Sequence, residues 1–211
     1  MRILALDTTG DTGSVALVED DRVIEEVVMS SPDGLAHVLF GEIEALLARH
    51  GVTIHQMDLF AAASGPGSFT GVRVGLAAVK GLAEATGRKV LAVSNLQALA
   101  SFGTRPLRAT VIDARRGEIF GAVYDSQLDL VSDEMVVKLE DWLAGLPKGD
   151  LEFITSGFPL DVGAPVLEAP RALAGAIGRI AAGRIHLAKD PAAIDANYVR
   201  RSDAELMWKE H

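Results

Sequence analysis

The chain has 211 residues, a formal net charge of -9 and no cysteine. The missing thiols exclude disulfides, thiolate metal sites and a cysteine nucleophile, and a pI near 5.0 argues against autonomous nucleic-acid binding, which needs clustered basic side chains. No apolar run approaches the roughly 20 residues of a membrane span, and Asp7 comes too early for a signal-peptide core. We therefore expect a cytoplasmic protein without membrane contact.

The first half of the chain predicts three strands followed by alternating helices and strands. An apolar run ends at Asp7 and a turn-rich stretch follows, after which Asp20-Asp21 separates two further strand-like runs. The period then changes to that of a helix, for which Asp33 is a candidate cap and Gly51 a candidate stop. The expected elements are strands 2–7, 14–19 and 22–29, helix 33–50, strand 57–63, helix 69–86, strand 89–93 and a short helix from Asn95 to about Phe102.

This order, βββαβαβα, combines antiparallel hairpins with parallel crossovers. It is the pattern of the ribonuclease-H-like half of the actin and sugar-kinase superfamily, so we expect an α/β fold with mixed sheets. A second, reduced half begins near Arg108, and residues 187–203 show no clear period. Its expected elements are strands 109–113, 118–124 and 128–137, helix 138–145, strand 151–156 and helix 170–184. We therefore expect two lobes, residues 1–103 and 104–211.

The segment from Ser64 to Gly75 joins a strand to a helix and is a turn by composition, because it holds four glycines and a proline. Such a turn either aims backbone N–H groups at an anion beside the helix N-terminus or caps the helix through Ser68 or Thr70. Its glycine spacing fits neither common phosphate-binding motif. The segment alone therefore does not establish nucleotide binding.

Asp7, Thr8 and Thr9 lie where actin-like ATPases place a phosphate-binding hairpin, and Asp113 ends the equivalent strand of the second half. Facing aspartates from two duplicated halves would suit binding of Mg²⁺ and phosphate. The alternative is that these residues close turns through bonds from side chain to backbone. The five histidines lack the helical spacing of a metal site, and no nucleophile has an evident base. We therefore expect neither a metal site nor a complete active site.

Small residues mark one surface of the expected helix 69–86. Gly71, Gly75 and Ala78 share a face, and a broader stripe adds Val74, Ala77, Gly81 and Ala85. A glycine inside a helix costs about 1 kcal/mol relative to alanine, so these glycines indicate close approach of another backbone. That backbone belongs either to the chain's own sheet or to a partner helix. Three residues of the preceding helix would widen the patch: Leu35, Leu39 and Ile43.

The block from Gly65 to Gly75, with Lys80-Gly81-Leu82-Ala83 after it, closely resembles the signature of the TsaB (YeaZ) family. Four shorter blocks are also similar and follow in the family's order. They are Leu4-Ala5-Leu6-Asp7-Thr8-Thr9, Val93-Ser94-Asn95-Leu96, Asp113-Ala114-Arg115 and Asn197-Tyr198-Val199-Arg200.

The resemblance implies a two-lobed actin-like (ASKHA) fold and a role in making N6-threonylcarbamoyladenosine at position 37 of tRNAs that read ANN codons. It implies a non-catalytic subunit, without cofactor, that pairs with the TsaD transferase and is joined by the small ATPase TsaE. It also implies a homodimer when the partner is absent, and contact with tRNA only through the complex. In the family the pairing uses the first two helices of the N-terminal lobe, which correspond here to 33–50 and 69–86.

Two departures from related patterns are visible. The helical H-x-x-x-H metal motif of TsaD-like relatives is absent from this chain. Leu35-Ala36-His37 stands where TsaB-family members commonly have His-Ser-Glu, and Gly41 stands where the family often has proline. The second departure falls on the first of the two helices that the family uses for pairing.

We therefore expect a scaffold subunit with no catalytic residue. Its expected partner interface comprises Leu35, Leu39, Ile43, Phe69, Gly71, Val72, Val74, Gly75 and Ala78. The rival hypothesis is an actin-like ATPase or kinase that uses Asp7, Thr8, Thr9 and Asp113. In a scaffold subunit those four residues would be a vestigial nucleotide-binding set.

Overall fold

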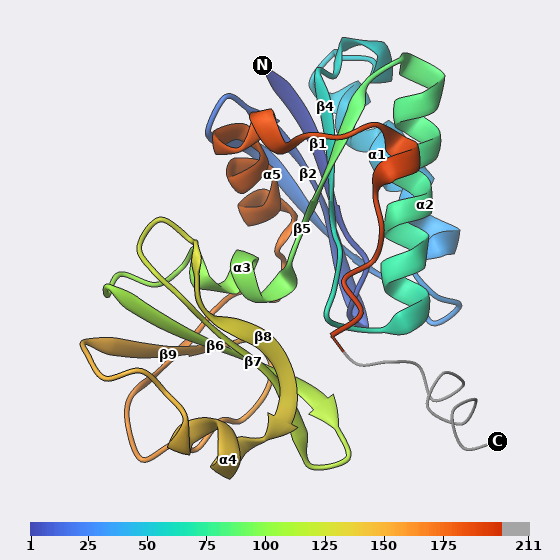
Figure 1. Cartoon of the computed structure of the whole chain (residues 1–211). Helices are drawn as coiled ribbons and strands as arrows, with labels where there is room; N and C mark the ends of the chain where they lie inside the picture. The colour runs from blue at the N-terminus through green and yellow to red at the C-terminus, as the bar shows by residue number, and fades with distance from the viewer. Residues whose placement is uncertain (200–211) are drawn as a thin grey trace, which may run out of the picture.

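The computed structural model describes residues 1–199, which form two five-stranded mixed sheets, one above the other in Figure 1. The strand orders are β3-β2-β1-β4-β5 and β10-β9-β6-β7-β8. The first half contains β1 (Arg2–Asp7), β2 (Thr12–Glu19), β3 (Arg22–Ser30), α1 (Ala36–Arg49), η1 (Ile54–Gln56), β4 (Leu59–Ala63), α2 (Phe69–Thr86), β5 (Lys89–Val93) and α3 (Asn95–Ala100). The second half contains β6 (Leu107–Arg115), β7 (Glu118–Tyr124), β8 (Leu130–Lys138), α4 (Leu139–Ala144), β9 (Leu151–Thr155), β10 (Val166–Glu168), α5 (Ala174–Gly183), η2 (Ile185–Leu187) and η3 (Pro191–Ala193).

The central strand β1 is buried on both faces, as its uninterrupted apolar sequence predicts. Leu4 and Leu6 point into the core beneath α1 and α2, while Ile3 and Ala5 point into the core beneath α5. β1 pairs antiparallel with β2 and parallel with β4, so hairpin and crossover meet at this strand. The first lobe is thus a sheet with helices on both faces (Figure 1).

Both ends of helix α2 are set by capping residues in the sequence. The hydroxyl of Ser68 accepts a hydrogen bond from the backbone N–H of Gly71 at 3.3 Å and caps the N-terminus, which confirms the capping prediction. Gly87 ends the helix with a φ of 65°, a left-handed conformation that glycine adopts without strain.

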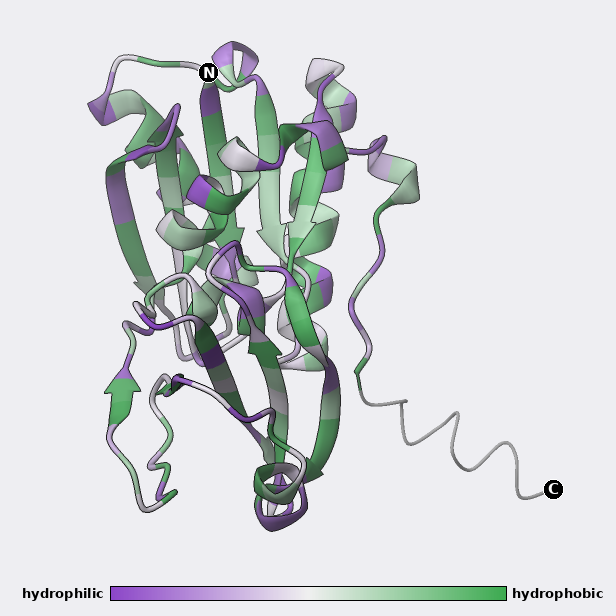
Figure 2. Ribbon diagram, turned by 60° about the vertical axis from the view of Figure 1, so that its left-hand side comes forward, coloured by the Kyte–Doolittle hydropathy of each residue, from purple (hydrophilic) through white to green (hydrophobic). Residues whose placement is uncertain are grey.

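The helices that cover the second sheet are shorter than those that cover the first. On one face Trp142 of α4 packs with Ala109 and Val111, and on the other Leu96 of α3 packs near Tyr124. Hydrophobic residues line the strands of both sheets, while hydrophilic residues gather in the turns and on outer helix faces (Figure 2). Trp142 packs on Gly121 of β7, where a Cβ would lie 2.7 Å from the indole ring.

Helix α5 comes from the second half of the chain yet packs on the first sheet. Its first backbone N–H groups are satisfied by that sheet: Ala174 donates to the Ser14 hydroxyl at 3.0 Å and Gly175 donates to the Glu26 carboxylate at 2.9 Å. The prediction of a helix from residue 170 was therefore too long, because residues 170–173 form the link that brings Ala174 to the sheet.

Residues 188–199, here called the strap, return to the first lobe and pass along α2 (Figure 1). Lys189 and Val90 exchange both backbone hydrogen bonds at 2.9 Å, and Ile194 is buried in the core beneath α2. The backbone N–H of Asn197 then donates to the Ser64 carbonyl at 2.8 Å. The predicted block that ends at Arg200 lies only partly within the described residues.

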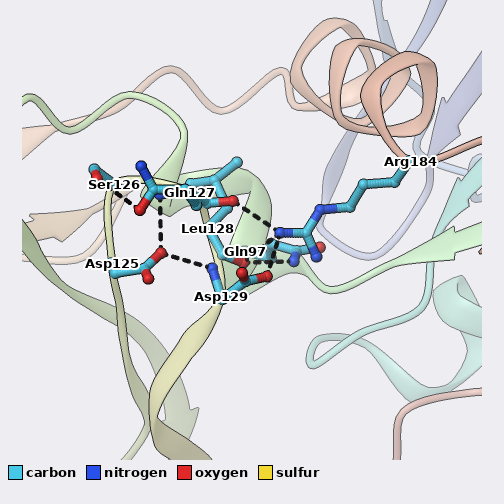
Figure 3. A network of polar contacts seen from close by, with 7 residues as sticks. All are labelled: Gln97, Asp125, Ser126, Gln127, Leu128, Asp129 and Arg184. Atoms are coloured by element: carbon cyan, nitrogen blue, oxygen red, sulfur yellow. Dashed lines mark hydrogen bonds and ion pairs between the residues drawn. The ribbon is translucent and has the colours of Figure 1, made fainter.

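A polar network joins the two lobes on the side of α5 (Figure 3). Arg184, at the end of α5, donates to two carbonyls of the turn 125–129 and forms a 2.7 Å ion pair with Asp129. Gln97 of α3 donates to the carbonyl of Leu128, one of the same two carbonyls, at 2.9 Å. The turn between β7 and β8 is therefore fastened to α5, which packs on the first sheet, and to α3.

Two further details differ from the sequence predictions. Helix α1 begins at Ala36, and Asp33 does not cap it; the backbone N–H of Asp33 instead donates to the Ser31 hydroxyl at 3.2 Å. Strand β10 was missed because it is short and stands between Pro165 and Pro170. The strap lacks a helical or strand period because its contacts are made one residue at a time.

Candidate functional site

The two lobes enclose a cleft of about 920 Å³ at the C-terminal ends of β1 and β6. Asp7 and Thr9 line it from the first lobe and Asp113 lines it from the second, so the structure brings these three predicted residues to one cleft. Thr8 lies on the other side of its turn, at a smaller hollow of about 400 Å³ between that turn and α1.

Asp7 is enclosed by its own turn. Its carboxylate accepts hydrogen bonds from the backbone N–H of Thr9 at 2.9 Å and from the Thr9 hydroxyl at 2.7 Å, and only 3% of the residue is exposed. Burial raises the pKa of Asp7, although the hydrogen bonds from Thr9 oppose that shift. A divalent cation needs an ionised carboxylate that is accessible to it. Asp7 is almost completely buried, and this burial disfavours its ionised form.

The glycine-rich turn fills the space beside Thr8 and Thr9. The backbone N–H of Ser68 donates to the Thr9 carbonyl at 2.7 Å, and a Cβ added to Gly67 would lie 2.8 Å from the Thr9 Cβ. The N–H of Gly65 donates to Asn95, whose amide also donates to the Thr9 hydroxyl at 2.7 Å. The N–H groups of Gly65 and Ser68 therefore bond within the chain, which favours the capping-turn alternative over an anion site.

The helical glycines Gly71 and Gly75 face Thr8. A Cβ at Gly71 would lie 2.0 Å from the Thr8 carbonyl oxygen, and a Cβ at Gly75 would lie 2.6 Å from the Thr8 hydroxyl. That hydroxyl donates to the Gly71 carbonyl at 2.7 Å. The close backbone approach that these two glycines predicted is therefore made to the chain's own first turn.

Asp113 also closes a turn. Its carboxylate accepts a hydrogen bond from the backbone N–H of Arg115 at 2.8 Å and lies 3.6 Å from the Arg115 guanidinium. Arg115 has a φ of 62°, and the side-chain bond stabilises this left-handed conformation. Within residues 1–199 no group of three histidine, aspartate or glutamate side chains is placed to hold a metal ion.

Most of the residues expected at a partner interface are buried inside this chain. Leu39 and Ile43 of α1, and Val72 of α2, are at most 4% exposed and belong to the core on that face of the first sheet. Leu35, Gly75 and Ala78 are buried as well. Phe69 is exposed, and Gly71 and Val74 are half-buried.

The exposed side of α1 and α2 is formed by residues that lie next to these buried residues in the sequence. Phe40 is 56% exposed and Phe69 is 47% exposed. Gly41 and Gly81 are exposed as well, and no atom of the described chain lies within 4 Å of a Cβ added at either. We call this surface the outer face; it comprises His37, Phe40, Gly41, Glu44 and Ala48 of α1 and Phe69, Arg73, Ala77, Gly81 and Ala85 of α2.

Comparison with known proteins places this geometry in a family. The chain is 29% identical to the tRNA threonylcarbamoyladenosine biosynthesis protein TsaB of Bacillus subtilis, over all of this chain and 99% of that protein. The solved structure of YeaZ from Pseudomonas aeruginosa superposes with a TM-score of 0.78 at 29% identity, covering 93% of this chain and 99% of the other. The family model of TsaD, tRNA N6-adenosine threonylcarbamoyltransferase, matches residues 35–170. The chain belongs to the TsaB (YeaZ) family.

TsaB of Escherichia coli is 35% identical over 59% of this chain and 55% of that protein. These likenesses confirm the predicted two-lobed α/β ASKHA fold with mixed sheets. Transferases of the TsaD type also match, for example that of Rhizobium meliloti, at 36% identity over 46% of this chain and 32% of that protein. This chain is thus similar to proteins of both types. The comparisons do not favour the rival ATPase or kinase hypothesis.

The sequence predicted a partner interface on α1 and α2, the two helices that carry the outer face, but it did not single out Phe40, Arg73 or Tyr198. Phe40 follows the buried Leu39 in a helix rich in apolar residues, so the hydrophobic period alone does not predict that its side chain is exposed. Arg73 follows Phe69 by four residues, a spacing that puts both on one helix face and that signals a joint surface.

No helix within residues 1–199 is both long enough and apolar enough to cross a membrane.

Proposed function

We propose that this chain is a non-catalytic subunit in the synthesis of N6-threonylcarbamoyladenosine in tRNA, and that its outer face docks a TsaD-type transferase. Gly41 and Gly81 carry the proposal. Each glycine costs its helix about 1 kcal/mol relative to alanine, and nothing in the described chain occupies the space beside it. Close packing of a partner helix on α1 and α2 would explain why glycine occurs at both positions.

The interlobe cleft supports the non-catalytic part of the proposal. Asp7, Thr9 and Asp113 meet there, but each is bound into its own turn, and burial raises the pKa of Asp7. The net charge of -9 opposes direct binding to tRNA, so the chain reaches tRNA through its partner. The TsaE-type ATPase joins this pair, and without a partner the outer face takes a second copy of the chain. These steps occur where tRNA is modified, in the cytoplasm.

The test is a substitution that adds bulk to the outer face without disturbing the fold. Gly81→Leu fills open space in the monomer, so at concentrations where the chain is monomeric its free energy of unfolding should stay equal or rise by up to about 1 kcal/mol. In the pair the same side chain overpacks a close contact, which costs about 1–3 kcal/mol of association. Sedimentation velocity with the TsaD-type subunit of the same genome measures that loss.

Gly183→Leu is the matched control, because Gly183 ends α5, on the far side of the first sheet, and also has open space around it. We expect the control to pair as the wild type does. Equal pairing of Gly81→Leu and the wild type would remove the outer face from the interface, and no pairing of the wild type would remove the proposed function.

A further inference from the structure

Three exposed side chains form a cluster at the N-terminal end of α2. The rings of Phe69 and Tyr198 lie 5.7 Å apart between centroids, and the Arg73 guanidinium lies 3.7 Å above the Phe69 ring. The Nε of Arg73 donates to the Tyr198 hydroxyl at 3.1 Å. Tyr198 is 50% exposed and Phe69 47%, so this anchor cluster presents a broad aromatic surface around one fixed cation.

The charge of Arg73 has no counter-ion within residues 1–199. Arg49 on α1 differs, because it forms a 2.8 Å ion pair with Glu25. The cation–π contact and the hydrogen bond from Nε to Tyr198 hold the guanidinium of Arg73 in place without using its two terminal amino groups. A pre-organised arginine loses less conformational entropy when it binds a carboxylate.

The anchor cluster continues the outer face. Phe69, Arg73, Ala77 and Gly81 follow one another at intervals of four residues, so they form a single row along α2. The strap brings Tyr198 to the start of that row, because Asn197 is fixed on one side to the Ser64 carbonyl. A partner that covers Gly81 and extends toward the N-terminus of α2 therefore covers Arg73.

We propose that the anchor cluster receives an acidic side chain of the docked subunit, with its carboxylate on the Arg73 guanidinium and its stem against the exposed ring surfaces of Phe69 and Tyr198. This inference rests on the proposed function. Its physical reason is that burying a cation without a counter-ion is costly, so an interface that covers Arg73 must supply a negative charge. Aromatic and arginine side chains are also the residue types that dominate binding energy at interfaces.

The experiment is calorimetric titration of the TsaD-type subunit with the wild type, Arg73→Gln and Tyr198→Phe, at low and high salt. Arg179→Gln is the matched control, because Arg179 is an exposed arginine of α5 with no hydrogen bond or ion pair among the described residues. We expect Arg73→Gln to bind at least about tenfold more weakly and to lose salt dependence relative to the wild type. Tyr198→Phe should bind a few-fold more weakly, and the control should bind as the wild type does.

Binding of Arg73→Gln within twofold of the wild type would overturn the anchor cluster and leave the docking face intact. A loss in Arg73→Gln that the control shares would also overturn it, because the effect would then be one of net charge. Failure of the wild type itself to bind would overturn both the anchor cluster and the proposed function. Circular dichroism of each variant establishes that the exposed substitutions leave the fold unchanged.

Discussion

The side-chain amide of Asn197 donates a hydrogen bond to the carboxylate of Glu134 and so ties the strap to β8 of the second lobe. The other oxygen of Glu134 accepts from the hydroxyl of Tyr124, which is buried between the lobes. Burial first, and then the charge of Glu134, raise the pKa of Tyr124, so this hydroxyl stays a donor. One carboxylate thus joins strap and second sheet beside the cleft.

Asn197→Ala should lower the free energy of unfolding by about 1–3 kcal/mol, because Glu134 loses one of its two donors in a partly buried place. Asp195→Ala is the control, since Asp195 is an exposed strap residue without a hydrogen bond in the described chain. Urea unfolding measures both variants. A loss no larger than that of the control would show that the strap is held by its backbone alone.

Arg184→Leu should release the turn 125–129, because it removes two hydrogen bonds to carbonyls and the ion pair with Asp129 (Figure 3). Asp129 is largely exposed, so most of the expected loss of about 1–2 kcal/mol comes from the carbonyls. Amide hydrogen exchange of the turn should accelerate in this variant and stay unchanged in Arg179→Leu. Unchanged exchange in Arg184→Leu would mean that Gln97 suffices to hold the turn.

Gly71→Ala and Gly81→Ala should act in opposite directions on the stability of the monomeric chain. A Cβ at Gly71 meets the Thr8 carbonyl oxygen at 2.0 Å, so this variant should lose more than about 3 kcal/mol or fail to fold. A Cβ at Gly81 meets nothing within 4 Å, so that variant should gain about 1 kcal/mol. Thermal unfolding compares the pair. Similar melting temperatures would contradict the assignment of Gly71 to a contact inside the chain.

Asp7 predicts a specific dependence of stability on pH. Its pKa is raised on folding, so the folded chain holds the proton more tightly, and this contribution is complete below the ordinary pKa near 3.8. It is lost as the pH rises from that value through the higher pKa of the folded state. The stability of the wild type relative to Asp7→Asn should therefore fall as the pH increases above about 4. Urea midpoints across that range test the sign, and a relative stability that rises with pH would contradict the burial argument.

The fold was predictable to the extent that its elements bury a regular face. β1 and α2 follow from a continuous apolar run and from a capped helix that ends at glycine. The strap was not predictable, because Asn197 bonds to Ser64 and Glu134, which lie far from it in sequence, through single contacts without a period.

The candidate site shows a second limit. An apolar period in a helix marks a face that is covered, but it does not say whether the cover is the chain's own sheet or another protein. Leu39 and Ile43 therefore entered the expected interface although they lie in this chain's core. The glycine pattern carries the same ambiguity: Gly71 and Gly75 accommodate Thr8, whereas Gly81 faces open space. Only the three-dimensional arrangement separates the two groups.

The most direct test of the account is the threonylcarbamoyladenosine content of tRNA in a reconstituted reaction that contains the TsaD-type subunit and this chain. We predict that Asp7→Asn supports as much modification as the wild type, because the cleft does no chemistry. Gly81→Leu should support less modification, in proportion to the pairing that it loses, and an excess of this variant should restore it. Abolished modification with Asp7→Asn, together with full modification with Gly81→Leu, would contradict the scaffold proposal. It would indicate instead that residues of the cleft take part in catalysis.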